Sequence, residues 1–153
     1  MSMTSPAASV AEREIVSLRL LHAPPERVFQ AFADPQQLVQ WWGPKGFSNT
    51  LQAFDFRPGG RWRHIMQGPD GANYENEAEF IEIVAPQRII FRHLEPIHRF
   101  QMTMIFAAKG GQTELIWRML FATAAEVAPL KNFISHANEQ NFDRLAALLA
   151  GRA

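Results

Sequence analysis

Two adjacent tryptophans in Trp41-Trp42-Gly43-Pro44 end a short helical pattern, and they constrain the fold more than any other feature of the chain. A second unusual segment, Asp55-Phe56-Arg57-Pro58-Gly59-Gly60, then breaks a strand at a Pro-Gly-Gly turn. The strands near both segments carry Trp, His, Met and Phe on their inward faces. This combination favours a strongly curved sheet around an internal pocket over a plain packed core.

The hydrophobic periodicity gives the order of the elements. In chain order it predicts a strand at 15–22, helices at 24–33 and 34–42, strands at 51–56, 61–67, 74–84, 88–93, 100–106 and 115–121, and a helix at 129–150. Consecutive strands joined by tight turns are antiparallel. The sequence therefore predicts an α+β protein, with a curved seven-stranded antiparallel sheet wrapped around a long C-terminal helix and two short helices after the first strand.

Several residues set the expected boundaries and faces. Asp34 is placed to cap the second helix, and Thr123 and Glu126 have the spacing of a capping box. Pro129 should kink or restart the helix that follows. In the first strand, Val16, Leu18 and Leu20 share the face opposite Ser17 and Arg19, and a bulge is expected at Phe80-Ile81.

Length and composition exclude several classes of protein. The 153 residues fit a single domain over 13–153, preceded by a flexible tail over 1–12. The 15 basic and 15 acidic residues cancel, which leaves no electrostatic footprint for nucleic acid or for a membrane surface. The absence of cysteine excludes disulfides and thiolate chemistry. We expect a cytoplasmic monomer or homodimer without a cofactor.

The motifs together resemble those of the START-like, helix-grip superfamily, SRPBCC, over about residues 14–149. Within it, the chain resembles the homologue family of the heat-shock-protein-90 ATPase activator. The matching segments are Ala23-Pro24, Trp41-Trp42-Gly43-Pro44, Asp55-x-Arg57-Pro58-Gly59-Gly60, Met66 before Gly68-Pro69-Asp70-Gly71, Pro86-x-Arg88 and Phe142-Asp143-Arg144-Leu145. Family members often carry Gly-Trp where this chain has Ala137-Asn138. The resemblance implies the helix-grip fold. Families with this fold include ligand carriers, co-chaperone modules and stress-response proteins.

The inward face of the predicted sheet and the last helix supply the candidate ligand-binding residues. They are Trp62, His64, Met66, Phe91, His93, His98, Phe100, Met102, Met104, Trp117, Met119, Phe133, Ala137 and Asn141. The aromatic and methionine side chains form an adaptable apolar lining or, equally, an ordinary core. The histidines are hydrogen-bonded strand-end residues, ligand-orienting groups or, third in rank, metal ligands, although no motif with metal-ligand spacing supports the last alternative.

Other polar residues have structural interpretations. Asp55 should accept hydrogen bonds from turn amides, and Arg57 should pair at the surface. Glu75, Glu77 and Glu79 alternate along one solvated strand face. Asn138, Asn141 and Arg144 are placed to reach the pocket mouth from the last helix. No nucleophile with a neighbouring base, phosphate loop or dinucleotide motif is present, so no catalytic residue is assigned.

Three functions remain open, in this order. The first is a binding protein for an apolar or aromatic small molecule, held between the sheet and the C-terminal helix and oriented by the histidines and Asn141. The second is a protein-interaction module for a chaperone or another protein, which the family resemblance implies. The third is an enzyme that uses a cavity histidine for acid–base chemistry.

Overall fold

The computed structural model describes residues 9–95 and 99–151. Its elements, in chain order, are α1 (Val10–Arg13), β1 (Glu14–Leu21), α2 (Pro25–Ala33), α3 (Pro35–Trp41), β2 (Ser48–Phe54), β3 (Arg61–Gln67), β4 (Asn73–Val84), β5 (Arg88–Glu95), β6 (Phe100–Lys109), β7 (Gln112–Phe121) and α4 (Ala124–Leu149). The strands form one seven-stranded sheet in the order β1-β7-β6-β5-β4-β3-β2. All six pairs are antiparallel, which confirms the predicted fold class.

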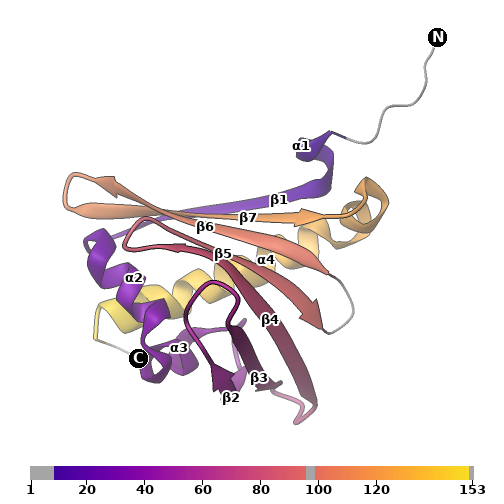
Figure 1. Cartoon of the computed structure of the whole chain (residues 1–153), viewed down its shortest axis with the longest axis horizontal. Helices are drawn as coiled ribbons and strands as arrows, with labels where there is room; N and C mark the ends of the chain where they lie inside the picture. Colours follow the sequence, from indigo (N-terminus) through magenta and orange to yellow (C-terminus); the bar gives the residue numbers. More distant parts are fainter. Residues whose placement is uncertain (1–8, 96–98, 152–153) are drawn as a thin grey trace.

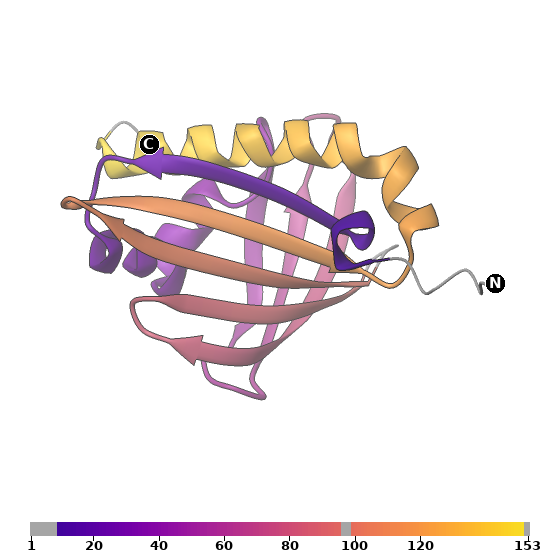
Figure 2. The same cartoon turned by 90° about the horizontal axis from the view of Figure 1, so that it is seen from above.

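The sheet curves around α4, which runs along its concave side beside β1 (Figures 1 and 2). The helices α2 and α3 lie near the C-terminal end of α4, at the end of the sheet where β1 finishes (Figure 1). The N-terminal end of α4 lies at the opposite end of the molecule, near α1 (Figure 2). The fold therefore has one end covered by helices and one end where only the sheet and α4 meet.

The local signals place the helix ends close to where the sequence predicts them. The Asp34 carboxylate accepts a hydrogen bond from the Gln36 amide, and Thr123 and Glu126 form the predicted capping box. The last helix begins at Ala124, directly after the predicted cap, and Pro129 lies inside it. Its first turns are angled away from the rest of the helix (Figure 2), as expected where a proline removes an i to i−4 hydrogen bond. The short helix α1, capped by Ser9, occupies part of the segment predicted as a tail.

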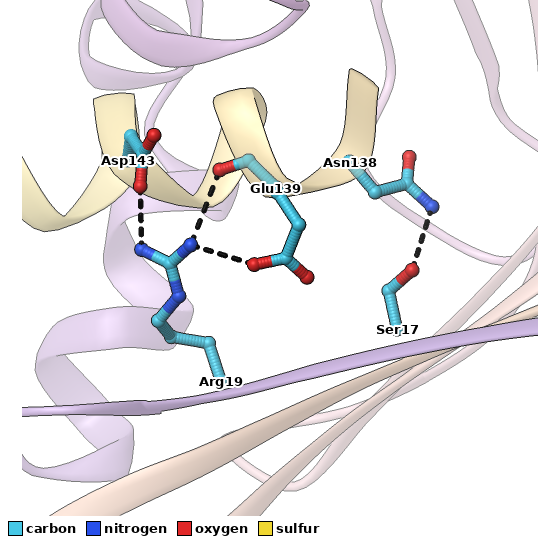
Figure 3. A network of polar contacts seen from close by, with 5 residues as sticks. All are labelled: Ser17, Arg19, Asn138, Glu139 and Asp143. Atoms are coloured by element: carbon cyan, nitrogen blue, oxygen red, sulfur yellow. Dashed lines mark hydrogen bonds and ion pairs between the residues drawn. The ribbon is translucent and has the colours of Figure 1, made fainter. Parts of the chain in front are cut away.

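In β1, the apolar set faces outward. Val16, Leu18 and Leu20 are 43%, 53% and 48% exposed, whereas Ser17 is buried beneath α4. The reason is a polar seam between β1 and α4 (Figure 3). The Asn138 amide donates to the Ser17 hydroxyl at 3.1 Å, and the Arg19 guanidinium contacts carboxylates on α4. Sequence alternation identifies the two faces of β1. It does not reveal that α4 supplies polar partners for Ser17 and Arg19, and so it does not show which face is buried.

The covered end of the molecule is filled by aromatic rings. Phe32 of α2 lies at their centre and contacts the rings of Trp41, Trp42, Phe54, Phe56, Trp62, Phe80 and Phe91. The Trp41 indole donates to the Ala31 carbonyl at 2.8 Å, which joins α3 to α2. Edge-to-face ring pairs of this kind add to the area that they bury. This end of the concave face is a packed core.

Two surface predictions are resolved by the contacts. The Arg57 guanidinium binds both carboxylate oxygens of Asp55 at 2.9 Å, so the Asp55 side chain holds Arg57 and it is the Asp55 backbone carbonyl that accepts a turn amide. On the outer face of β4, Glu77 pairs with Arg61 at 2.9 Å. The register shift between Phe80 and Glu82 confirms the predicted bulge.

Candidate ligand-binding site

The open end of the fold contains a pocket of about 410 Å³ between α4 and the sheet. Its size lies toward the lower end of the range for small-molecule sites, roughly 300–1,000 Å³. The residues that line it are Pro44, Phe47, Met66, Tyr74, Asn76, His93, Phe100, Phe121, Phe133, Ile134 and Ala137. They come from the α3–β2 loop, from the five strands β3 to β7 and from the first half of α4.

Strand register explains why these side chains meet. Met66 lies opposite Tyr74 in the β3–β4 pair, His93 opposite Phe100 in the β5–β6 pair, and Phe100 opposite Phe121 in the β6–β7 pair. Opposite residues of antiparallel strands project to the same face of a sheet. The His93 ring stacks on Phe100 at 4.8 Å, and the Phe100 and Phe121 rings lie 5.3 Å apart. The result is a continuous aromatic floor.

The α4 side of the pocket has an exposed aromatic rim. Phe133 lines the pocket and yet is 74% exposed. It precedes Ile134 and lies one helical turn before Ala137, so these three side chains form the helical wall. A ligand that covers a large apolar side chain at the mouth of an apolar pocket removes its surface from water, and this burial favours binding.

The loop between α3 and β2 closes the pocket on a third side, and Arg144 holds it. The guanidinium of this α4 residue donates to four carbonyl oxygens at 3.0–3.2 Å, those of Gln40, Trp42, Gly43 and Pro44. Carbonyls at the end of α3 have no further helical partners, so a cation there is favourable. Burial lowers the pKa of Arg144. Arg144 therefore positions the loop without reaching the pocket itself.

His64 is buried next to the lining residues Met66 and Asn76 but does not line the pocket. It is 4% exposed, and both ring nitrogens are buried without a hydrogen-bond partner among the described residues. Its ring stacks on Trp62 at 4.5 Å and lies opposite Asn76 in the β3–β4 pair. Burial, aided by the nearby His93, lowers the pKa of His64 to about 4. The residue is thus a neutral imidazole at physiological pH.

The structure divides the sequence-predicted site residues into three groups. Met66, His93, Phe100, Phe133 and Ala137 line the pocket. A second group is buried away from it and fills the core: Trp62, Phe91, Met102, Met104, Trp117 and Met119. His64 and Asn141 are buried polar residues, and the Asn141 Oδ1 atom has no partner among the described residues. His98 lies outside the described residues.

The sequence interpretation missed six lining residues: Pro44, Phe47, Tyr74, Asn76, Phe121 and Ile134. Tyr74 and Asn76 alternate with the outward Glu75 and Glu77, so strand periodicity could have found them. Pro44 and Phe47 belong to a loop, whose path depends on tertiary contacts such as those of Arg144. Asn138 does not reach the pocket mouth, because its amide donates to Ser17.

Two further observations concern the described part of the chain as a whole. Within residues 9–95 and 99–151, no group of three His, Cys, Asp or Glu side chains is arranged to hold a metal ion. Of the helices in the described part of the chain, none has the length and apolarity that crossing a membrane requires.

A curved antiparallel sheet gripping a C-terminal helix, with a pocket between them, defines the helix-grip class of the START-like superfamily. Residues 22–150 match the family model described as activator of Hsp90 ATPase homolog 1-like protein. The chain therefore belongs to this family. A search of curated proteins finds no match.

Solved structures share the whole fold. A protein from Arthrobacter aurescens has a TM-score of 0.86 at 21% identity, covering 95% of this chain and 91% of the other. A protein from Nitrosomonas europaea has a TM-score of 0.84 at 21% identity, with 92% and 96% covered. A protein from Chromobacterium violaceum has a TM-score of 0.78 at 27% identity, with 89% and 96% covered. These similarities concern the fold.

Proposed function

We propose that this protein binds an apolar, aromatic small molecule in the pocket between α4 and the sheet. The observation that carries the proposal is the pocket of about 410 Å³ with Phe133 standing 74% exposed at its rim. Five of its lining residues are aromatic: Phe47, Tyr74, Phe100, Phe121 and Phe133. Apolar walls with a few polar groups are the usual anatomy of a small-molecule site.

The position of the pocket supports binding rather than simple looseness of packing. Rings around Phe32 fill the concave face beneath α2 and α3, whereas the pocket of about 410 Å³ lies beneath the first half of α4. Strands, helix and loop each contribute a wall, and Arg144 holds the loop by contacts outside the cavity. A preformed site lowers the ordering cost of binding.

The test uses N-phenyl-1-naphthylamine, an uncharged dye whose fluorescence rises in apolar surroundings. The intact chain should enhance its fluorescence saturably. Ala137→Trp places a large ring in the pocket and should abolish the enhancement, whereas Ala125→Trp, at an exposed position of the same helix, should leave it unchanged. A dye response that is absent from the unaltered chain, or equal in both variants, would remove the proposal.

A protein-interaction module is the second candidate, and the outward face of β1 is the feature that favours it. Val16, Leu18 and Leu20 are between 43% and 53% exposed on an edge strand. Exposed apolar edges are sites where another chain can add. A pull-down with the Hsp90 chaperone that is unaffected by Leu18→Glu would count against this candidate.

A further inference from the structure

The described lining of the pocket has no permanently charged side chain, and this restricts the ligand class that it takes. Among its described lining residues there is no Lys, Arg, Asp or Glu, and the polar side chains are Tyr74, Asn76 and His93. Burying a charged ligand group without an opposite charge is costly. The walls thus favour a neutral molecule, and the aromatic rings favour a flat one.

A buried hydrogen-bonding group, His64, lies next to residues that line this pocket without lining it itself. His64 is 4% exposed, and neither ring nitrogen has a partner among the described residues. On β3 its neighbour on the same face is Met66, and across the sheet it lies opposite Asn76; both residues line the pocket. Buried polar atoms in folded proteins are nearly always satisfied by protein, water or ligand.

Among the buried side chains without a partner in the described residues, His64 is the one that has both ring nitrogens unsatisfied and is adjacent to the lining residues Met66 and Asn76. The Asn76 amide nitrogen already donates to the Tyr74 carbonyl at 3.0 Å. The His93 ring stacks on Phe100 and lies near enough to His64 to act on its protonation. Met66 lies two residues from His64 on the same face of β3 and lines the pocket, and its flexible side chain can adapt to a ligand that reaches His64.

A neutral imidazole presents one N–H donor and one nitrogen acceptor. A hydroxyl complements whichever of the two nitrogens faces the pocket, because it can donate to the acceptor or accept from the N–H. A methyl group satisfies neither nitrogen, and a carboxylate only accepts and carries a charge. We infer that the ligand is an uncharged, hydroxyl-bearing aromatic molecule, a phenol in its simplest form, whose hydroxyl binds His64 while its ring lies on the aromatic floor of Phe100 and Phe121.

This inference rests on the proposed function, and three probes of one shape separate the two. They are 2-naphthol, 2-methylnaphthalene and 2-naphthoate, measured by equilibrium dialysis at pH 7.5 with the intact chain. Partition into an apolar site alone favours the methyl compound. A hydrogen bond to His64 should reverse that order and give 2-naphthol about tenfold tighter binding. The naphthoate should bind most weakly.

The matched variants are His64→Phe, which keeps a ring against Trp62, and His136→Phe, at an exposed histidine of α4. His64→Phe should erase the preference for 2-naphthol while 2-methylnaphthalene still binds, and His136→Phe should keep it. Circular dichroism and a melting curve verify that each variant is folded.

Each alternative outcome would overturn a defined part of the inference about the ligand. Equal binding of 2-naphthol and 2-methylnaphthalene, both lost in Ala137→Trp, leaves the pocket as the binding site but contradicts the hydroxyl assignment. A preference for 2-naphthol that survives His64→Phe also contradicts it. Tightest binding of 2-naphthoate contradicts the uncharged class. No binding of any probe removes this inference and the proposed function together.

Discussion

The burial of His64 lowers the stability of the folded protein, because its polar ring nitrogens are removed from water. Its ring packs 4.5 Å from Trp62 in the interior, and its nitrogens lack partners among the described residues. A buried donor or acceptor left unsatisfied costs about 1–3 kcal/mol, whereas an apolar group of the same shape avoids that cost. We attribute the presence of a histidine here to binding rather than to folding, since stability–function conflicts are typical of functional sites.

Acid titration provides the first prediction. The unfolded chain protonates His64 near its ordinary pKa of 6.5, while the folded protein resists protonation until about pH 4. Between these values the unfolded state binds more protons, so the free energy of unfolding falls as the pH falls. The His64 contribution to this loss reaches about 3 kcal/mol by pH 4. The His64→Phe variant should lack this His64 contribution to the loss of stability at low pH, and at pH 7 it should be more stable than the unaltered chain.

Urea denaturation at several pH values between 7.5 and 4.5 measures this effect. The difference in free energy of unfolding between His64→Phe and the unaltered chain should widen steadily below pH 6.5. His136→Phe, the exposed control, should show no such widening. A difference that stays constant over this pH range would contradict a buried, neutral His64.

The Pro-Gly-Gly turn supplies a second prediction from two adjacent glycines. A Cβ atom on Gly60 would lie 1.9 Å from the backbone oxygen of Asp55, while one on Gly59 would meet nothing within 4 Å. Gly60 also accepts from the Phe80 amide, so the backbone cannot move away freely. Gly60→Ala should cost about 3 kcal/mol or more. Gly59→Ala, at a positive φ of 83°, should cost about 1–2 kcal/mol.

Denaturant unfolding of the two glycine variants compares them directly. Equal losses of stability would show that backbone conformation, rather than the close approach to Asp55, explains the motif. The same contact gives a physical reason for the second glycine of the family-like Asp55-x-Arg57-Pro58-Gly59-Gly60 segment.

At the scale of elements, periodicity predicts most of the fold. The strands and the two short helices lie within a few residues of their predicted positions, and the bulge and caps are confirmed. Periodicity could not predict which inward-facing residues line the pocket and which fill the core. Trp62, Phe91 and Trp117 have the same pattern as Met66, His93 and Phe100, but the first three pack against the rings of α2, α3 and α4. Distance from α2 and α3 decides between core and pocket.

Arg144 gives the prediction at this scale. It connects α4 to four carbonyls at the end of α3, and the loop that it holds contributes Pro44 and Phe47 to the pocket. Arg144→Met keeps the aliphatic stem and removes the donors, so it should cost about 2–3 kcal/mol. It should also speed amide exchange over residues 43–47. Arg118→Met, which breaks a pair with Glu14, should cost less than Arg144→Met, because it removes one donor contact rather than four.

Unfolding curves and hydrogen exchange measured by mass spectrometry test this role. If Arg144→Met and Arg118→Met had equal effects on stability, and exchange over 43–47 stayed slow, the loop would be held by its other contacts. One of these is the hydrogen bond from the Lys45 amide to the Gln140 side chain at 3.2 Å.

At the scale of the whole molecule, the pocket lies away from the aromatic core around Phe32. The helices α2 and α3 fill one end of the concave face, and the first half of α4 meets the sheet at the other end without an intervening layer (Figure 2). A ligand there would take the place of that layer. It would join the first half of α4 to β5, β6 and β7.

Ligand binding should therefore stabilise the molecule as a unit. A ligand that binds only the folded state, at one hundred times its dissociation constant, adds about 2.7 kcal/mol, which raises the melting temperature of a chain of this size by roughly 5–10 °C. Amides of α4 around Phe133 to Ala137, and those near His93 and Phe100, should gain the most protection from exchange, because their side chains line the pocket. The measurement is a melting curve and an exchange map with and without 2-naphthol. In Ala137→Trp the added ring occupies the same space, so its melting temperature should not respond to the probe, while that of Ala125→Trp should. Protection confined to the α2–α3 end, or a shift of equal size in both variants, would place the bound molecule elsewhere.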